Sequence, residues 1–429
     1  MYQAPKGTHD ILPEDWPYWR HVMAVAEEMA ALFGFERMDV PIFEATELFE
    51  RGAGEGAAVV VDKEMYTFQD KGNTSLTLRP EFTAGLMRAY LEHGMKVRPQ
   101  PVKLYTIGPI FRQERPQAGR YRQHTQWNVE VVGELDPAVD FEVMSIAWSL
   151  FVRLGFRGLA FQINSIGCNA VDCRPRYIEA LKAYYEPHRA ELNEVDRRRL
   201  DVNPLRLLDS KEDASQKLLH DAPRSSDSLC PECRAHFQTL LGYLDQANMP
   251  YSINPRLVRG FDYYTKTVFE VWAEGIGAQA AVCGGGRYDG LIELLGGPST
   301  PGIGFGSGIE RLILTLKAQG ATPPVLSRPV VQVSYTGKDE IGRQAKLAAL
   351  DLVRELRSLG VGALLPFGER SLKSQLKAAD KAGVQWVVIV GEGELAGGEW
   401  SVRSLSDGSQ QTIARTALPA WLHSHIGVE

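Results

Sequence analysis

Residues 124–131 alternate strictly between polar and apolar side chains, a pattern that few structures other than a β-strand accommodate. His124, Gln126, Asn128 and Glu130 fall on one face, because successive side chains of a strand point in opposite directions. The other face is apolar and suits a hydrophobic core. An antiparallel strand with one solvated face has the same pattern, so the alternation predicts the strand and leaves the role of its polar row open.

Further strand and helix signals surround this segment. Residues 65–69 and 74–78 form a predicted hairpin around the turn-forming sequence DKGN, and residues 103–112 precede the alternating strand as its partner. Residues 17–33 carry apolar side chains at helical spacing up to Gly34. Antiparallel hairpins interleaved with helices favour an α+β fold over a doubly wound sheet.

A chain of 429 residues is too long for one compact core, so two or three domains are expected. Helical spacing and many charged residues indicate a helical insertion at about 172–248. Strand signals return at 263–272, and a Pro-rich break at 322–324 precedes a segment that alternates strand and helix. We therefore predict a first domain at 1–325, which contains the insertion, and an α/β domain at 327–429.

Composition narrows the class of protein. The net charge of −6 argues against a protein that coats polyanions, although a large enzyme can confine basic residues to one groove. No apolar run approaches the roughly 18 residues of a membrane span, and the N-terminus lacks the layout of a signal peptide, so we expect a cytoplasmic protein. Four cysteines fall in two pairs, and the second has a C-x2-C spacing that would suit zinc: Cys168, Cys173, Cys230 and Cys233. We predict that all four are reduced thiols and bind no structural metal.

Residues 111–122, with the sequence FRQERPQAGRYR, place four arginines in a loop that contains proline and glycine. Guanidinium groups bind phosphates and carboxylates through paired hydrogen bonds and stay charged at neutral pH. A solvated basic loop would have the same composition. The loop leads directly into the polar row of the alternating strand, which favours an anion-binding site there.

Three shorter segments carry weaker signals. Pro80 suits the first position of a helix, and Glu81 and Thr83 follow it. A carboxylate at this position either interacts favourably with the helix dipole, by less than about 1 kcal/mol, or binds the ammonium group of a substrate. We predict that residues 283–290 form a flexible turn into a helix, and that residues 302–311 form a bare backbone stretch before another helix. Neither matches a P-loop or a dinucleotide fingerprint. Glycines at such positions let a flat ligand lie against the main chain.

In this order the segments resemble the class II aminoacyl-tRNA synthetases, and specifically the histidyl-tRNA synthetases. The helix and strand that end at Pro41 resemble the first class motif, which builds a dimer interface. The arginine loop with the alternating strand resembles the second, and GFGSGIER at 304–311 resembles the third. LVRGFDYY at 257–264, GGGRYDG at 284–290 and the starting PKGTHD at 5–10 are similar to the histidine enzymes. The resemblance spans nearly the whole chain and implies an antiparallel-sheet catalytic domain with a helical insertion, followed by a C-terminal anticodon-binding domain.

The resemblance also implies how ATP is bound. Arg112 is similar to an arginine that grips the α-phosphate and the substrate carboxylate, and Arg259 to one across the same phosphate, so both are expected to be catalytic. Arg120 would reach the γ-phosphate, Glu114 the adenine amino group, and Arg311 the adenine face.

His124 departs from the family pattern, which usually has phenylalanine stacked on adenine at this position. Because imidazole is also flat, we expect altered ATP affinity and retained activity. The family motif gives this histidine no part as a catalytic base.

Histidine recognition is the other role that the resemblance implies. Glu81, Thr83 and Gln126 would hold the α-ammonium group, whereas Glu130 and Tyr264, with Tyr263, would meet the imidazole nitrogens. Core packing in a strand is the alternative for the two tyrosines. The full predicted set is Glu81, Thr83, Arg112, Gln126, Glu130, Arg259, Tyr263 and Tyr264.

The tail is identified as the anticodon-binding domain of such an enzyme. One face of a predicted helix in the tail is basic and carries Arg370, Lys373, Lys377 and Lys381. Such faces are usually only solvated. The resemblance implies that this face binds tRNA. The implied substrates are L-histidine, tRNA(His) and ATP with Mg²⁺, handled by a homodimer with no membrane association.

Three other classes of protein remain as alternatives. The main one is the non-catalytic, histidine-sensing regulatory subunit of ATP phosphoribosyltransferase, which typically lacks the tail domain and parts of the arginine segments that this chain retains. A synthetase for another amino acid conflicts with Glu130 and the tyrosine pair. A sensor module of a larger kinase would need kinase motifs, which the sequence lacks.

Overall fold

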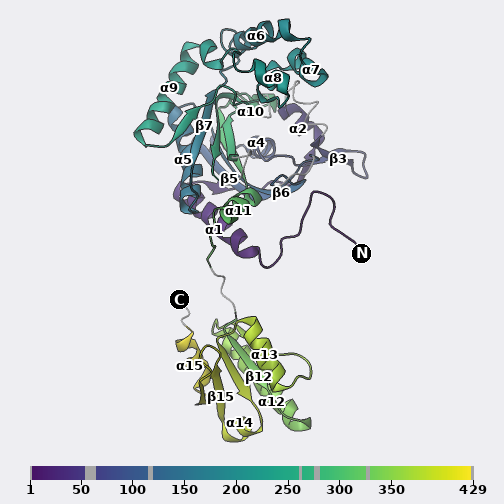
Figure 1. Cartoon of the computed structure of the whole chain (residues 1–429), viewed down its shortest axis with the longest axis vertical. Helices are drawn as coiled ribbons and strands as arrows, with labels where there is room; N and C mark the ends of the chain where they lie inside the picture. The colour runs from purple at the N-terminus through teal and green to yellow at the C-terminus, as the bar shows by residue number, and fades with distance from the viewer. Residues whose placement is uncertain are drawn as a thin grey trace. The chain divides into compact units, whose positions relative to one another are not determined.

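The computed structural model describes residues 2–53, 64–114, 119–259, 263–274, 281–324 and 329–426. These residues form two compact units, Met1–Pro324 and Val325–Glu429 (Figure 1). Each unit buries a hydrophobic core of its own. No helix among the described residues is long and apolar enough to cross a membrane.

An eight-stranded sheet organises the first unit, with the strand order β1-β5-β6-β11-β10-β9-β7-β8. The outermost pairs β1–β5 and β7–β8 are parallel, and every other neighbouring pair is antiparallel. This topology confirms the predicted α+β class. The strands are β1 (Glu36–Arg37), β5 (Val102–Phe111), β6 (Gln123–Val132), β7 (Ala160–Ser165), β8 (Tyr251–Ile253), β9 (Thr265–Trp272), β10 (Ala281–Arg287) and β11 (Gly302–Gly308).

The main core lies on one face of this sheet, against α1 (Trp16–Leu32), α5 (Pro137–Arg153) and α11 (Ile309–Ala318). Trp127 and Val129 of β6 belong to the same buried cluster as apolar residues of these helices. The apolar side of β6 therefore packs into the core, as its alternation predicts, and its polar side is left for the opposite face.

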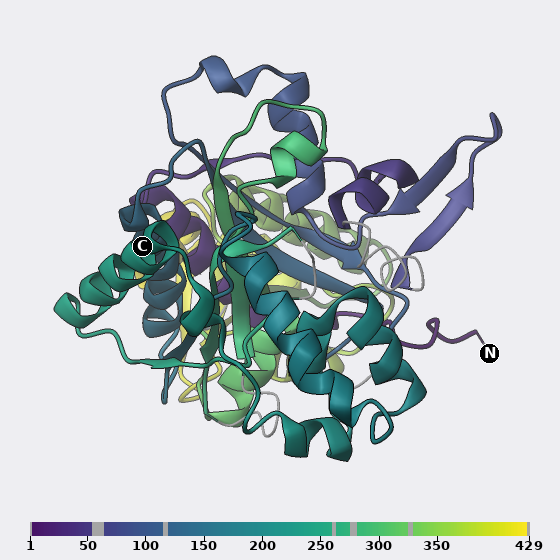
Figure 2. The ribbon, with the colours of Figure 1, turned by 90° about the horizontal axis from the view of Figure 1, so that it is seen from above.

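A smaller sheet and several helices complete the first unit. The predicted hairpin is present as β3 (Tyr66–Gln69) and β4 (Ser75–Leu78), pairs with β2 (Phe43–Ala45), and projects from the unit in Figure 2. The remaining helices are α2 (Thr46–Ala53), α4 (Thr83–Glu92), α10 (Leu291–Leu294) and, between β7 and β8, the helices α6 (Arg174–Tyr185), α7 (Glu194–Val202), α8 (Asp213–Leu218) and α9 (Pro231–Gln246). Tyr177, Leu181 and Leu200 form part of a separate core within that helical segment.

Two glycine-rich segments differ from the prediction. The segment predicted as a flexible turn contains β10, and the one predicted as a bare stretch forms β11; both lie inside the large sheet. Glycine disfavours strands by itself, but β11 pairs with β6 along its whole length and with β10 over Ile303–Gly306. Tertiary pairing therefore overrides the local propensity.

The second unit contains a five-stranded sheet in the order β13-β12-β14-β15-β16. Leu352, Leu356 and Leu422 from two of its helices pack with the central strands. Its last two strands and last two helices were not predicted from the sequence. The elements are β12 (Val331–Tyr335), α12 (Asp339–Ser358), β13 (Ala363–Leu364), α13 (Leu372–Ala382), β14 (Trp386–Val390), α14 (Glu392–Gly397), β15 (Glu399–Ser404), β16 (Gln410–Ala414) and α15 (Leu418–His425).

Candidate active site

A pocket of about 240 Å³ lies on the polar side of the large sheet. It is lined by Glu81, Thr83, Arg112, Gln126, Asn128, Arg259, Tyr263, Tyr264, Gly284, Tyr288, Gly304, Phe305 and Gly306. Seven of the eight residues predicted to bind histidine are in this set. The eighth, Glu130, is 1% exposed and contacts the pocket-lining residues from beneath.

Arg112 and Arg259 bring two guanidinium groups to this pocket. Nε of Arg112 donates to the carbonyl of Pro80 at 2.9 Å, and Nη1 of Arg259 donates to Glu270 Oε1 at 2.7 Å. A Cβ at Gly284 would lie 2.5 Å from the Arg259 guanidinium, so a larger residue there would displace the guanidinium from this position. Nε of Arg259 is buried and has no hydrogen-bond partner within the described parts of the chain, which leaves a donor for a ligand.

Glu130 accepts hydrogen bonds from three side chains beneath the pocket. Thr83 Oγ1 and Asn128 Nδ2 donate to Oε1 at 2.6 and 2.7 Å, and the Tyr288 hydroxyl donates to Oε2 at 2.5 Å. Burial raises the pKa of Glu130 from 4.5 to about 7, although these three hydrogen bonds lower it. Near neutral pH a ligand N–H that reached this group would stabilise its charged form.

Glu130→Gln is expected to gain stability relative to the wild type as the pH rises from 5 to 8. The folded state holds the Glu130 proton up to about pH 7, whereas the unfolded state releases it near 4.5, so in this window the folded wild type binds more protons and loses stability as pH rises. Glutamine does not titrate. Thermal unfolding of both proteins at pH 5 and pH 8 measures the difference, and parallel pH curves would contradict the raised pKa.

The pocket floor is made of main chain where β10 and β11 pass beneath it. A Cβ at Gly304 would lie 1.8 Å from Glu130 Oε2, and one at Gly306 would lie 2.2 Å from Gln126 Nε2. Both glycines pair with β6, which carries these polar side chains. Side chains on β11 at these positions are therefore excluded, because the polar row of β6 occupies that space.

The start of α4 is arranged differently from the prediction. The helix begins at Thr83, so the prediction that Pro80 is its first residue is wrong; the Pro80 carbonyl accepts from Arg112 instead. Glu81 accepts hydrogen bonds from the backbone N–H groups of Thr83 and Ala84. Burial raises the pKa of Glu81, and these N–H groups and Arg112 oppose the shift. Glu81 thus caps the helix and still lines the pocket.

His124 and Arg311 lie together at the C-terminal end of β11. A Cβ at Gly308 would be 3.9 Å from His124 Cδ2 and 4.0 Å from Arg311 Cβ. Burial, reinforced by the positive charges of Arg112 and Arg311, lowers the pKa of His124 to about 3. Its ring is therefore neutral at physiological pH, which suits stacking on a flat ligand rather than proton transfer.

The arginine loop folds back on the start of the chain. Glu114 lies 3.8 Å from Arg112 and 3.6 Å from Arg120, measured between carboxylate oxygen and guanidinium nitrogen. The backbone N–H of Arg122 donates to the carbonyl of Gly7 at 2.7 Å. The PKGTHD segment thus supports the loop. Residues 115–118 of the loop and 260–262 of the LVRGFDYY segment lie outside the described residues.

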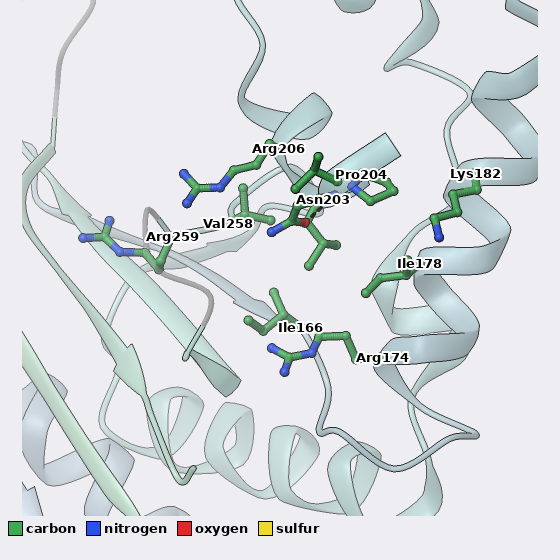
Figure 3. Close-up of a pocket in the computed structure, with 11 residues that line it drawn as sticks. Ile166, Arg174, Ile178, Lys182, Asn203, Pro204, Arg206, Val258 and Arg259 are labelled. Carbon is green, nitrogen blue, oxygen red and sulfur yellow. Dashed lines mark hydrogen bonds between the residues drawn. The ribbon is translucent and has the colours of Figure 1, made fainter. Parts of the chain in front are cut away.

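A second pocket, of about 230 Å³, adjoins the first at Arg259, which lines both (Figure 3). Ile178 and Lys182 of α6 form one wall, and Pro204 and Arg206 from the turn after α7 form another. The helical segment between β7 and β8 therefore borders the end of the site where Arg259 lies.

Four residues of the site were not predicted from the sequence. Asn128 belongs to the predicted polar row, and Tyr288 follows the glycine run, so both lie in segments that the sequence singled out. The family resemblance assigned neither of them a role. Glu310 accepts from the Thr125 backbone N–H at 2.7 Å and holds β6 to α11. Glu270 stands among the apolar residues of the second half of β9 and had no recognisable signal.

Comparisons with known proteins agree with this geometry. The family model described as histidyl-tRNA synthetase matches residues 7–312, and the one described as anticodon binding domain matches residues 331–425. Relatives named histidine–tRNA ligase include one from Dehalococcoides mccartyi, 51% identical over 96% of this chain and 97% of its own length, and one from Desulforamulus reducens, 46% identical over 96% of both. The crystal structure of apo S. aureus histidyl-tRNA synthetase has a TM-score of 0.82 at 37% identity and covers 98% of this chain and 99% of its own. The chain belongs to the histidyl-tRNA synthetase family.

Proposed function

We propose that this chain activates L-histidine with ATP and transfers the histidyl group to tRNA(His). The observation that carries the proposal is the pocket in which Arg112, Arg259 and Glu81 converge over a glycine floor, in a chain of this family. Two fixed guanidinium groups suit a phosphate and a carboxylate, and a buried carboxylate suits an ammonium group. An amino acid and a nucleotide would together present these groups.

In the first step the histidine carboxylate attacks the α-phosphate of ATP, which enters as its magnesium complex, and pyrophosphate leaves. We assign Arg112 and Arg259 to that phosphate as catalytic residues. Guanidinium groups held in place stabilise the developing charge without rearranging, and Glu270 fixes Arg259 at 2.7 Å. The other contacts to ATP are assigned to Glu114, Arg120, His124 and Arg311.

Recognition of the amino acid is assigned to other residues of the same pocket. Glu81, Thr83 and Gln126 would bind the α-ammonium group. Glu130 and Tyr264, with Tyr263, would pair with the two imidazole nitrogens. A substrate that lacked these nitrogens would leave a buried carboxyl and a buried hydroxyl unpaired, which is a strong form of rejection.

In the second step the terminal ribose of the tRNA takes the histidyl group from the adenylate. Neither step requires a covalent bond to the enzyme, so positioning and charge stabilisation account for the catalysis. The proposed division of labour gives this chemistry to the first unit and anticodon binding to the second.

Amino-acid-dependent ATP–pyrophosphate exchange tests the function. The expected result is exchange with histidine and none with the other standard amino acids. Histidine binding without exchange would overturn the proposal and favour the histidine-sensing regulatory subunit of ATP phosphoribosyltransferase. Exchange with a different amino acid would instead place the chain among synthetases of another specificity.

The exposed basic face of α13 is expected to bind the phosphate backbone of tRNA(His). Leu372, Leu376 and Ala379 pack into a core, whereas Lys373, Lys377, Lys381 and Arg370 are exposed. Replacing the three lysines with alanine should flatten the dependence of log Kd for tRNA on log salt by about 2, because each lost phosphate contact removes about 0.7 from the slope. Arg354→Ala, which removes an exposed charge from α12, is the control. An unchanged slope in the triple variant would place the tRNA elsewhere.

We also propose a homodimer, as the family resemblance implies. Ile42, Phe43 and Phe68 are exposed apolar side chains beside the segment that ends at Pro41. Analytical ultracentrifugation at micromolar concentration should give twice the chain mass of 47.6 kDa.

A further inference from the structure

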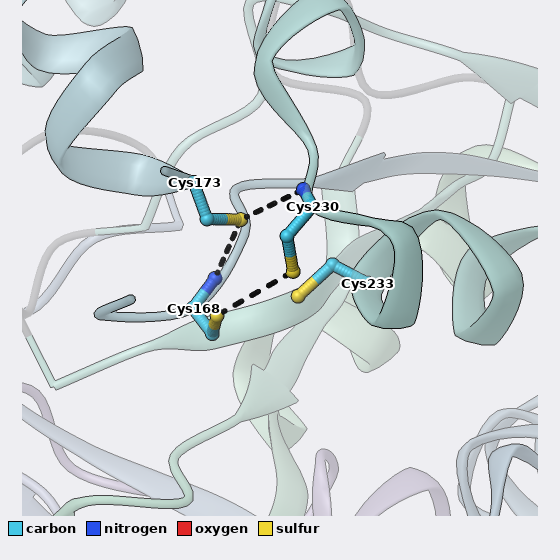
Figure 4. Close-up of side chains that lie close together, drawn as sticks. All are labelled: Cys168, Cys173, Cys230 and Cys233. Atoms are coloured by element: carbon cyan, nitrogen blue, oxygen red, sulfur yellow. Dashed lines mark hydrogen bonds between the residues drawn. The ribbon is translucent and has the colours of Figure 1, made fainter. Parts of the chain in front are cut away.

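Four cysteine side chains, from two parts of the first unit that are far apart in sequence, meet at the two ends of the helical segment between β7 and β8. Cys168 follows β7, and Cys173 immediately precedes α6. Cys230 immediately precedes α9, and Cys233 lies in its first turn. Figure 4 shows the four side chains directed toward a common centre. Their Sγ atoms all lie within 4.8 Å of one another, and three of the four residues are buried.

The spacing of the sulfur atoms matches a tetrahedral metal site. Zinc bonded to four thiolates at about 2.3 Å holds the sulfurs about 3.8 Å apart. The Sγ atoms of Cys168 and Cys230 are 3.9 Å apart, although 62 residues separate them in sequence. Four sulfur ligands in this geometry select zinc over the cations that prefer oxygen.

The backbone around the cluster is shaped for the sulfurs. The N–H groups of Cys168 and Cys230 donate to the Cys173 Sγ at 3.3 and 3.4 Å, which is the kind of support that orients a thiolate ligand. Gly167 adopts a positive φ of 72°, and a Cβ there would lie 2.6 Å from the Cys173 Sγ. Only glycine lets the chain turn at this point and admits the sulfur.

The cluster lies next to Tyr264, which immediately precedes β9 and is one of the residues proposed to bind histidine. Arg174, the residue after Cys173, donates from Nη1 to the Tyr264 carbonyl. Lys266 Nζ lies 3.0 Å from Glu232, which stands between the two cysteines of α9. The cysteines thus sit where both ends of the helical segment contact the segment that leads into β9.

We propose that Cys168, Cys173, Cys230 and Cys233 bind one structural Zn²⁺, which fastens the two ends of the helical segment to the wall of the histidine pocket. This replaces the expectation from sequence of metal-free thiols. Zinc displaces the thiol protons to solvent without any change of oxidation state, and four thiolates leave no open position, so the ion takes no part in the reaction. The Lys266 ammonium group, held at Glu232 between Cys230 and Cys233, is placed to offset part of the negative charge of such a centre.

Metal analysis of the full-length protein, purified without added metal or chelator, tests the proposal. The expected content is about one zinc per chain in the wild type and in Cys283→Ser, the fifth cysteine, which lies outside the cluster. Cys230→Ser should lose most of the zinc. A content below about a tenth of a zinc per chain, iron in its place, or disulfides among the four cysteines by mass spectrometry would overturn the proposal.

Cobalt substitution supplies a second measurement on the wild-type chain, which matters if Cys230→Ser does not fold. Co²⁺ exchanged into a four-thiolate tetrahedral site should give intense thiolate-to-metal absorption and d–d bands typical of that geometry. Octahedral, weakly absorbing cobalt would contradict the site. Both measurements are independent of catalysis, so they distinguish failure of this inference from failure of the proposed function.

Discussion

Replacing Arg259 with alanine is expected to lower the kcat of histidine-dependent ATP–pyrophosphate exchange by about 10²- to 10³-fold, the range for removing one fixed donor from a transition state. The guanidinium is held by Glu270 and fits against Gly284, so its position is set before substrates bind. Lysine keeps the charge but has no planar fork, so Arg259→Lys should recover only part of the loss.

Arg256→Ala is the matched control for this variant, because Arg256 is exposed and only three residues earlier in the same segment. It should exchange pyrophosphate at close to the wild-type rate. If Arg259→Ala raised the KM for ATP and left kcat unchanged, Arg259 would contribute uniform binding rather than transition-state stabilisation. That outcome would remove it from the catalytic pair with Arg112.

Arg287→Met is expected to lower the free energy of unfolding of the first unit by about 3–5 kcal/mol, the range for breaking a buried ion pair. Arg287 is 0% exposed, and its Nε donates to Asp140 Oδ1 at 2.6 Å. Its other nitrogens donate to the carbonyls of Glu134 and Asp136 at 3.0 and 3.2 Å. Methionine fills similar volume but removes the guanidinium that pairs with the buried Asp140 carboxylate, and urea unfolding measures the loss.

Arg153→Met on the same helix as Asp140 provides the reference for this experiment. Its side chain is 61% exposed and pairs with Glu28 at the surface, so the change should stay within about 0.5 kcal/mol. Asp140 also accepts from His236 of α9 at 2.9 Å, which ties the helical segment to the same buried carboxylate. A loss below about 1 kcal/mol for Arg287→Met would mean that water reaches Asp140 in the variant.

Local patterns predicted the elements whose structure depends on their own residues. The alternation of residues 124–131 is enough to place β6 and the direction of its two faces, because a strand has a period of two wherever it occurs. The hairpin of β3 and β4 follows in the same way from its turn residues. The glycines of β10 and β11 carry no such signal, since their strand conformation depends on pairing with the neighbouring strands of the sheet.

The site is predictable from sequence to a similar depth. The motif matches identified many of the residues that line the pocket, but not that Tyr288 and Thr83 both donate to Glu130. Those contacts join segments far apart in sequence, and only the fold brings them together. The sequence singled out the same four cysteines but could not show that they meet, because their two pairs are separated by three α-helices and the turns between them.

The main-chain floor at Gly304 and Gly306 limits which mutations could make this enzyme resistant to an inhibitor. Drug resistance commonly arises when a pocket side chain is exchanged for a larger one that blocks the compound. Any larger residue at either glycine would collide with Glu130 or Gln126, so the change would disturb the side chains proposed to bind histidine together with the inhibitor. A compound that takes its affinity from this floor should therefore retain potency.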